Sequence, residues 1–260
     1  MPDPPASLFA AADGPAPDPW AGLQAFTAAR IALGRTGTSE PLRAALAFRL
    51  AHAHARDAVY SALDTDRLLA ELPALGLPVL RVHSQAADRP AYLQRPDRGR
   101  QLAAESRRAL AARGPGPCDV AVVLADGLSA TAVNAHAAPL LAALLPPLRA
   151  AGCRLGPLVL AAQARVALGD ETGQLLGARL VLVLIGERPG LSAPDSLGAY
   201  LTHGPRPGLT DAARNCVSNI RPAGLGYAAA ADTLFFLLRE ALRRGLSGVG
   251  LKDESGRLGA

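Results

Sequence analysis

A loop rich in charges and in turn-forming residues follows one of the most apolar segments of the chain. Residues 186–195 read GERPGLSAPD, and residues 180–185 before them read LVLVLI. Two glycines and two prolines restrict the backbone of this loop, and Glu187 and Arg188 stand directly after the apolar segment. A carboxylate in this position can accept hydrogen bonds from a bound cofactor, and it can equally form an ion pair within the loop. Both interpretations remain open on these residues alone.

A serine follows a second apolar segment, in a position where a catalytic nucleophile could stand. Residues 119–125 (DVAVVLA) are followed by Asp126, Gly127 and Ser129, where a helical pattern begins. A nucleophile elbow has this position, but its second glycine is missing here, and no base and acid partner can be identified. The alternatives are that Ser129 and Asp126 cap the helix, and that the turn offers amide donors to phosphate or amide groups of a ligand.

The histidines and cysteines do not form a metal-binding pattern. His52 and His54 would point about 200° apart on a helix, so they cannot share one ion. The other histidines come from separate segments: His83, His136 and His203. The three cysteines are odd in number and widely spaced, without a CxxC: Cys118, Cys153 and Cys216. We therefore predict no metal site and reduced thiols in a cytosolic protein, and we interpret Cys216 as a small packed side chain.

The turn with Ser129 and the loop with Glu187 each follow a segment that is predicted to be a strand. Residues 119–125 and 180–185 are short, continuous and rich in valine and leucine, as expected of strands buried on both faces of a parallel sheet. In an open α/β sheet, ligands bind in the crevice beyond the carboxyl ends of the strands. The loop at 186–195 leaves such an end, which makes it the leading candidate for a ligand site.

The region before these strands has a mostly helical pattern. Leu42, Leu46 and Leu50 recur at a spacing of four and form one apolar stripe, and residues 77–83 could form a strand. Residues 114–117 (GPGP) are the best candidate for a boundary between domains.

The predicted fold class is α/β, with a C-terminal Rossmann-like domain that has a mostly parallel sheet, preceded by a mainly helical N-terminal region. The expected limits are a flexible tail at 1–20, the helical region at 21–113 and the α/β domain at 118–252. A last helix at 227–244 ends in two arginines and Gly245, where cations and a glycine are favoured.

Composition and charge exclude several classes of protein. Half of the 260 residues are hydrophobic and 4% are aromatic, which predicts a folded chain with a core of Ala, Leu and Val. No apolar stretch reaches the roughly 18 to 20 residues of a membrane span, and residues 1–20 lack the basic and apolar parts of a secretory signal. The net charge is +5, but no run of basic residues reaches five, so we predict neither a membrane nor a nucleic-acid partner.

Six segments in order resemble one family, the small subunit, or light chain, of ethanolamine ammonia-lyase. They are residues 29–35 (ARIALGR) with the later 48–53 (FRLAHA), 92–97 (YLQRPD), 125–130 (ADGLSA), 165–171 (RVALGDE), 185–191 (IGERPGL) and 215–221 (NCVSNIR). The resemblance covers roughly residues 25–252. No single motif is decisive, but the six in this order are.

The resemblance implies a carbon–nitrogen lyase that depends on adenosylcobalamin and is active only with a barrel-type large subunit. The cobalt–carbon bond breaks homolytically, the adenosyl radical takes a hydrogen from ethanolamine, and migration and loss of the amino group yield acetaldehyde and ammonia. By matching motifs, the cobalamin-contacting residues of the family fall on Val166, Glu187 and Cys216. Glu187 would accept hydrogen bonds from the cofactor, and the other two would contact it as walls.

The resemblance assigns a supporting role to this chain. It has no evident acid, base or radical partner of its own, so no catalytic residue is predicted, and a DxHxxG cobalt-ligand motif is absent. Residues 21–113 would contact the large subunit in a hetero-oligomer. The family implies a cytoplasmic location, with a bacterial microcompartment as an alternative for some members. A free-standing α/β nucleotide-binding protein is the alternative function, although no GxGxxG follows either buried strand.

Overall fold

In the computed structural model, residues 18–257 are described, so most of the tail predicted at residues 1–20 lies outside the described residues. The chain divides into two compact units, Met1–His54 and Ala55–Ala260. The residues at 114–117 lie inside the second unit, so the expected boundary there does not coincide with this division. The other domain limits stay predictions.

The first unit contains little regular structure before its long helix. A 3-10 helix, η1 (Ala21–Phe26), precedes an extended segment with one bridge between Thr36 and Ser39. Helix α1 (Leu42–Tyr60) begins in this unit and continues beyond its end. The predicted stripe of three leucines lies on α1, where Leu42, Leu46 and Leu50 are exposed.

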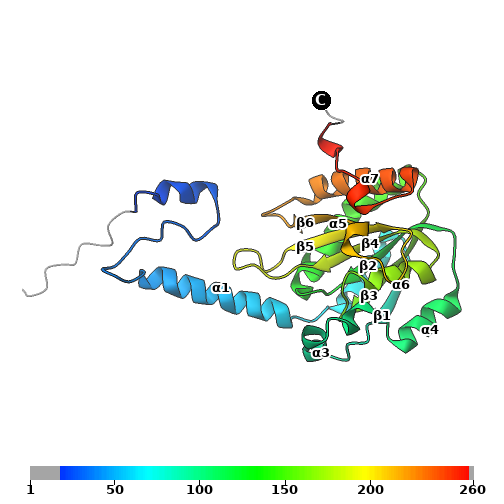
Figure 1. Ribbon diagram of the computed structural model, residues 1–260, viewed down its shortest axis with the longest axis horizontal. Helices are drawn as coiled ribbons and strands as arrows, with labels where there is room; N and C mark the ends of the chain where they lie inside the picture. Colours follow the sequence, from blue (N-terminus) through cyan, green and yellow to red (C-terminus); the bar gives the residue numbers. More distant parts are fainter. Residues whose placement is uncertain (1–17, 258–260) are drawn as a thin grey trace, which may run out of the picture. The chain divides into compact units, whose positions relative to one another are not determined.

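The second unit is built on one six-stranded sheet with the order β1-β3-β2-β4-β5-β6 (Figure 1). The strands are β1 (Val79–His83), β2 (Cys118–Ala125), β3 (Leu155–Ala162), β4 (Ala178–Gly186), β5 (Leu197–His203) and β6 (Arg214–Ile220). Strands β1 to β4 pair in parallel, whereas β5 pairs antiparallel with both β4 and β6. The α/β class is confirmed, but the prediction of a mostly parallel sheet is wrong, because the sheet is mixed.

The connections explain why the sheet is mixed. A parallel crossover needs a dozen or more residues, usually with a helix, whereas a short loop returns the chain antiparallel. Residues 187–196 alone connect β4 to β5 and contain no helix, so β5 runs back along β4. In addition β1, from the region expected to be mainly helical, pairs with β3 in the same sheet. The structure therefore does not confirm a helical N-terminal region followed by a separate Rossmann-like domain.

Helices cover both faces of the sheet. Their bounds are α2 (Thr65–Glu71), α3 (Arg89–Gln94), α4 (Ala104–Arg113), α5 (Ala130–Ala150), α6 (Leu168–Leu175) and α7 (Tyr227–Arg244), and short 3-10 turns are η2 (Leu72–Leu75), η3 (Arg98–Arg100), η4 (Asp211–Ala213), η5 (Gly248–Gly250) and η6 (Ser255–Arg257). Alternate residues of β2 and β4 face two separate apolar cores, as the period of a strand requires. Helices α2, α5 and α7 pack into one core, and α4 and α6 pack into the other.

The two central strands and the last helix match their predicted positions. β2 and β4 are buried along nearly their whole lengths, and α7 has the predicted bounds with Gly245 in the left-handed conformation after it. Helix α5 continues despite three internal prolines, Pro139, Pro146 and Pro147. The reason is that eleven of its residues are buried in the core, which offsets the cost of the prolines. By length and composition α5 could also span a membrane, and more than half of that apolar stretch is buried inside the protein.

Candidate functional site

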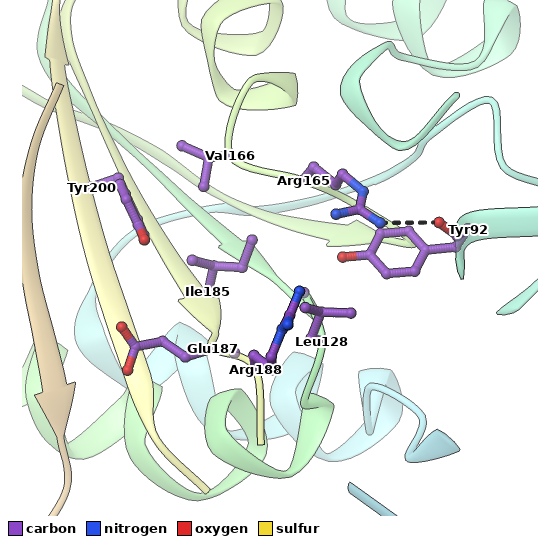
Figure 2. Close-up of a pocket in the computed structure, with 10 residues that line it drawn as sticks. Tyr92, Leu128, Arg165, Val166, Ile185, Glu187, Arg188 and Tyr200 are labelled. Carbon is purple, nitrogen blue, oxygen red and sulfur yellow. Dashed lines mark hydrogen bonds between the residues drawn. The ribbon is translucent and has the colours of Figure 1, made fainter. Parts of the chain in front are cut away.

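A cleft of about 470 Å³ opens at the carboxyl ends of β2 and β4 (Figure 2). It is lined by Tyr92, Gly127, Leu128, Arg165, Val166, Ile185, Gly186, Glu187, Arg188 and Tyr200. These residues come from α3, from the ends of β2, β3 and β4, and from β5. The position beyond the carboxyl ends of parallel strands is where open α/β sheets bind ligands.

Two glycines allow the floor of the cleft to form. Gly127 has a φ of +59°, and its Cα lies so close to the carbonyl of Gly186 that a Cβ atom would collide with it. Gly186 in turn lies against the carbonyl of Ser129, again without room for a Cβ atom. Through this contact the N–H of Leu128 donates to the Gly186 carbonyl over 2.9 Å. The turn after β2 is therefore joined directly to the start of the loop that carries Glu187.

Asp126 holds the segment after β3 in place. Its buried carboxylate accepts hydrogen bonds from the N–H groups of Gly127 at 3.0 Å, Gln163 at 2.8 Å and Ala164 at 2.9 Å. Burial raises the pKa of Asp126. The three hydrogen bonds favour the ionised form and offset part of this rise. The sequence suggested that Asp126 caps a helix. Its carboxylate instead fixes the backbone that leads to Val166.

Ser129 occupies the N-cap position of α5 without making a capping hydrogen bond. Its buried hydroxyl donates to the carbonyl of Pro194 over 2.8 Å, near the far end of the 186–195 loop. His136 on α5 contacts Asp195 of the same loop at 3.2 Å and the hydroxyl of Tyr227 at 2.8 Å. Ser129 therefore anchors the loop, and its arrangement is not that of a nucleophile bonded to a base.

Glu187 is held by two donors on one of its carboxylate oxygens. Oε2 accepts a short hydrogen bond from the hydroxyl of Ser196 and a second from the N–H of Asn219 at 3.2 Å. The backbone N–H of Glu187 also donates to the Ser196 carbonyl over 2.9 Å. Among the residues that the structure describes, none donates to Oε1. The carboxylate is thus oriented by the protein and keeps one oxygen available to a ligand.

Tyr200 lies at the same end of the cleft as Glu187, and Cys216 lies next to Tyr200 on the neighbouring strand. Tyr200 and Cys216 are directly paired residues on the neighbouring antiparallel strands β5 and β6. Desolvation by the surrounding protein raises the pKa of the Cys216 thiol, and the neighbouring Tyr200 hydroxyl partly offsets this rise. Cys216 is exposed on the edge of the sheet, so its interpretation as a packed side chain is wrong, but its thiol stays neutral.

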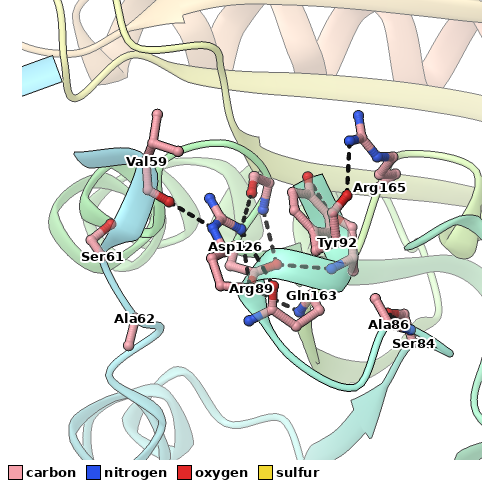
Figure 3. A network of polar contacts seen from close by, with 12 residues as sticks. Val59, Ser61, Ala62, Ser84, Ala86, Arg89, Tyr92, Asp126, Gln163 and Arg165 are labelled. Carbon is pink, nitrogen blue, oxygen red and sulfur yellow. Dashed lines mark hydrogen bonds and ion pairs between the residues drawn. The ribbon is translucent and has the colours of Figure 1, made fainter. Parts of the chain in front are cut away.

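Arginine side chains surround a buried tyrosine at the other end of the cleft (Figure 3). The guanidinium groups of Arg89 and Arg165 each lie 4.6 Å from the ring centre of Tyr92, and Arg165 donates to the Tyr92 carbonyl over 3.2 Å. Arg89 donates to the carbonyls of Val59 at 2.6 Å and Gly127 at 2.8 Å. Burial raises the pKa of Tyr92 to about 12, so the ring stays neutral between the two cations.

The structure places two of the three sequence-predicted residues in the cleft and the third beside a residue that lines it. Val166 and Glu187 line the same cleft, and Cys216 lies opposite Tyr200, which lines it too. The candidate residues predicted from the sequence do not include Tyr92, Arg165 or Tyr200. Tyr92 opens the YLQRPD motif and Arg165 precedes Val166, so two of them lay within segments that carried the resemblance.

A metal site does not emerge from the described part of the chain. Residues 18–257 contain no group of three or more His, Cys, Asp or Glu side chains that could hold an ion. His52 and His54 lie on α1, outside the cleft.

Comparisons with known proteins identify the family. The family model described as ethanolamine ammonia-lyase light chain (EutC) matches residues 17–252. The chain belongs to this family. Its curated relatives include ethanolamine ammonia-lyase small subunits from Ralstonia nicotianae, 59% identical over 91% of this chain and 88% of the relative, and from Bradyrhizobium diazoefficiens, 60% identical over 90% of each. A third, from Xanthomonas campestris, is 58% identical over 94% of this chain and 90% of the relative. Membership implies a lyase role for the light chain.

Proposed function

We propose that this light chain is the small subunit of an adenosylcobalamin-dependent ethanolamine ammonia-lyase, which converts ethanolamine to acetaldehyde and ammonia together with a barrel-type large subunit. The family supports the reaction. The observation that carries the cofactor site is the cleft itself, since it gathers Val166 and Glu187 beside Cys216 at the carboxyl ends of the central strands.

The residues of the cleft fit one side of a cobalamin. A cleft of about 470 Å³ is too small to enclose a corrin ring with its side chains, so it would cover part of the cofactor while the large subunit covers the rest. Oε1 of Glu187 is an acceptor, which suits the carboxamide N–H groups at the rim of a corrin. Adenosylcobalamin would supply a carbon radical by homolysis of its cobalt–carbon bond.

The chain's own side chains orient the cofactor and exclude water from it. Glu187 would hold a carboxamide through Oε1 while Ser196 and Asn219 keep the carboxylate in place. Val166 would form an apolar wall, and the neutral thiol of Cys216 would add a contact without charge. We assign no proton transfer to these groups, and the absence of a catalytic residue from this chain stays a prediction.

Contact with the large subunit would involve the region at 21–113. Leu42, Leu46 and Leu50 form an exposed apolar stripe on α1 of the kind that subunit interfaces bury. We place the assembled enzyme in the cytoplasm, with a bacterial microcompartment as the alternative.

The site is tested with the complex of this chain and its large subunit. Glu187→Gln keeps the shape of the side chain but removes the charge that Ser196 and Asn219 support, so adenosylcobalamin should bind about tenfold more weakly in equilibrium dialysis. Asp232→Asn, on the exposed face of α7, is the control for loss of a carboxylate and should leave the affinity unchanged.

Three outcomes would count against the proposal. Equal affinity of the Glu187→Gln complex would remove this residue from the site. Turnover of ethanolamine by the isolated chain with added cofactor would contradict the division of roles between subunits. Thermal protection by nucleotides without any response to cobalamin would favour the free-standing nucleotide-binding alternative.

A further inference from the structure

The two ends of the cleft differ in charge. Figure 2 shows Arg165 and Arg188 on the side away from the carboxylate of Glu187 and from Tyr200. The apolar side chains of Val166 and Ile185 lie between the two ends, and Leu128 lies beside Arg188. The cleft therefore presents a hydrogen-bond acceptor at one end and two cations at the other.

Neither cation of the cleft is neutralised by the chain itself. Within residues 18–257, Arg165 and Arg188 take part in no ion pair, whereas Asp126, Asp170 and Glu171 nearby in sequence are already paired with other arginines. Arg165 is half-buried in the cleft and Arg188 is exposed at its rim, so an anion that lies between them would be attracted by both charges. The arrangement thus favours a ligand that carries a negative group at this end.

The protein holds Arg165 through its side chain and Arg188 through its backbone. Arg165 stacks on the ring of Tyr92 and donates through Nη2 to its carbonyl, so its remaining N–H groups are pre-positioned. Arg188 is fixed at its backbone, because Pro189 follows it and Glu187 before it is bonded to Ser196. A guanidinium presents its donors in a planar fork that matches the oxygens of a phosphate.

We propose that Arg165 and Arg188 bind the phosphodiester of the cobalamin nucleotide loop, and that this contact sets the direction in which the cofactor lies across the cleft. This inference rests on the proposed function. The corrin side chains of cobalamin are neutral carboxamides, and the phosphodiester is the anionic group on its periphery. The carboxamides then lie toward Glu187 and the nucleotide loop lies toward the arginines.

The test compares two ligands that differ in this group. Adenosylcobalamin carries the phosphodiester, whereas adenosylcobinamide has the same corrin and adenosyl group but lacks the phosphate, ribose and base. Both are titrated in the dark against the complex with the large subunit, using wild type, Arg188→Gln and Arg188→Lys. Arg206→Gln, on an exposed loop away from the cleft, is the control, and assembly of each complex is measured by size-exclusion chromatography.

Arg188→Gln should lower the affinity for adenosylcobalamin about 10- to 100-fold, the usual effect of losing a hydrogen bond between charged groups. The same variant should leave the affinity for adenosylcobinamide within twofold of wild type. Arg188→Lys keeps the charge and should recover part of the loss. Added salt should weaken adenosylcobalamin binding to wild type more than to Arg188→Gln.

An equal loss of affinity for both ligands, or a loss of assembly with the large subunit, would overturn the assignment of the phosphodiester. In that case Glu187→Gln would still weaken both ligands, and the proposed function would stand. If neither ligand bound to the wild-type complex, the proposed function and the assignment would fail together.

Discussion

A buried ion pair ties the two segments that carry Val166 and Cys216, and its removal gives a quantitative test of the site's framework. Asp170 on α6 and Arg214 at the start of β6 form a two-pronged pair, with Oδ1–Nη1 at 2.6 Å and Oδ2–Nη2 at 2.8 Å. Asp170 is 1% exposed and Arg214 is 8% exposed. Asp170 lies four residues after Val166, and Arg214 lies two residues before Cys216.

Asp170→Asn replaces the carboxylate by an amide of nearly the same shape. The variant leaves the charge of Arg214 buried, with only Thr202 Oγ1 at 3.0 Å and the Leu209 carbonyl at 3.2 Å as close neutral partners. Loss of one partner of a buried pair costs about 3–5 kcal/mol. For a protein of this size, that lowers the melting temperature by about 6–20 °C.

The measurement is urea unfolding at pH 7, together with the melting temperature. Asp211→Asn is a matched control, because Asp211 also contacts Arg214, at 3.4 Å, but its carboxylate is fully exposed. An exposed pair contributes about 1 kcal/mol or less, so this control should stay within that range of wild type. A loss below about 1 kcal/mol for Asp170→Asn would refute the view that the pair fixes the framework.

Two further predictions concern the positioning of Glu187 and the acid stability of the sheet. Ser196→Ala removes the hydroxyl that donates to Glu187 and should weaken adenosylcobalamin binding by the assembled complex severalfold in equilibrium dialysis, whereas Ser196→Thr should restore it; equal affinities for both variants would contradict this role. The pKa of Asp119 lies well below its usual range, mainly because Arg154 donates hydrogen bonds to its carboxylate. The contribution of this pair to the free energy of unfolding is therefore complete above about pH 4 and is lost as the pH falls further. Asp119→Asn should therefore be less stable than wild type at pH 6 in urea unfolding, with a difference that shrinks toward pH 2; a constant difference would be inconsistent with this linkage.

Local patterns in the sequence were sufficient for the elements whose signal does not depend on distant partners. The valine-rich runs of β2 and β4 match buried strands, and α7 has the predicted bounds because its apolar spacing, terminal arginines and Gly245 all act within one helix. The exposed loop at 186–195 was likewise recognised as a candidate site from its charges and its position after a strand.

The direction of the outer strands depended on contacts that no local pattern contains. β5 and β6 read LGAYLTH and RNCVSNI, without the long apolar runs of the central strands. Their antiparallel pairing follows from the short connections and from the free edge of β4, and the same pairing places Cys216 opposite Tyr200. The prediction of a mostly parallel sheet failed because it was extended from the central strands to the edge.

The sequence by itself determined the α/β class, the central strands, the last helix and the family. The residues that indicate each of these features are close together in the chain. Only the tertiary structure decided the cleft, because Tyr92, Arg165 and Tyr200 come from separate elements that meet when the sheet forms. It also decided which polar atoms already have a hydrogen-bond partner. The hydroxyl of Ser129 donates to a carbonyl, whereas the described residues leave Oε1 of Glu187 without a donor. The partners that determine the hydrogen bonds of Ser129 and Glu187 are far apart in the chain, so residue spacing in the sequence cannot predict them.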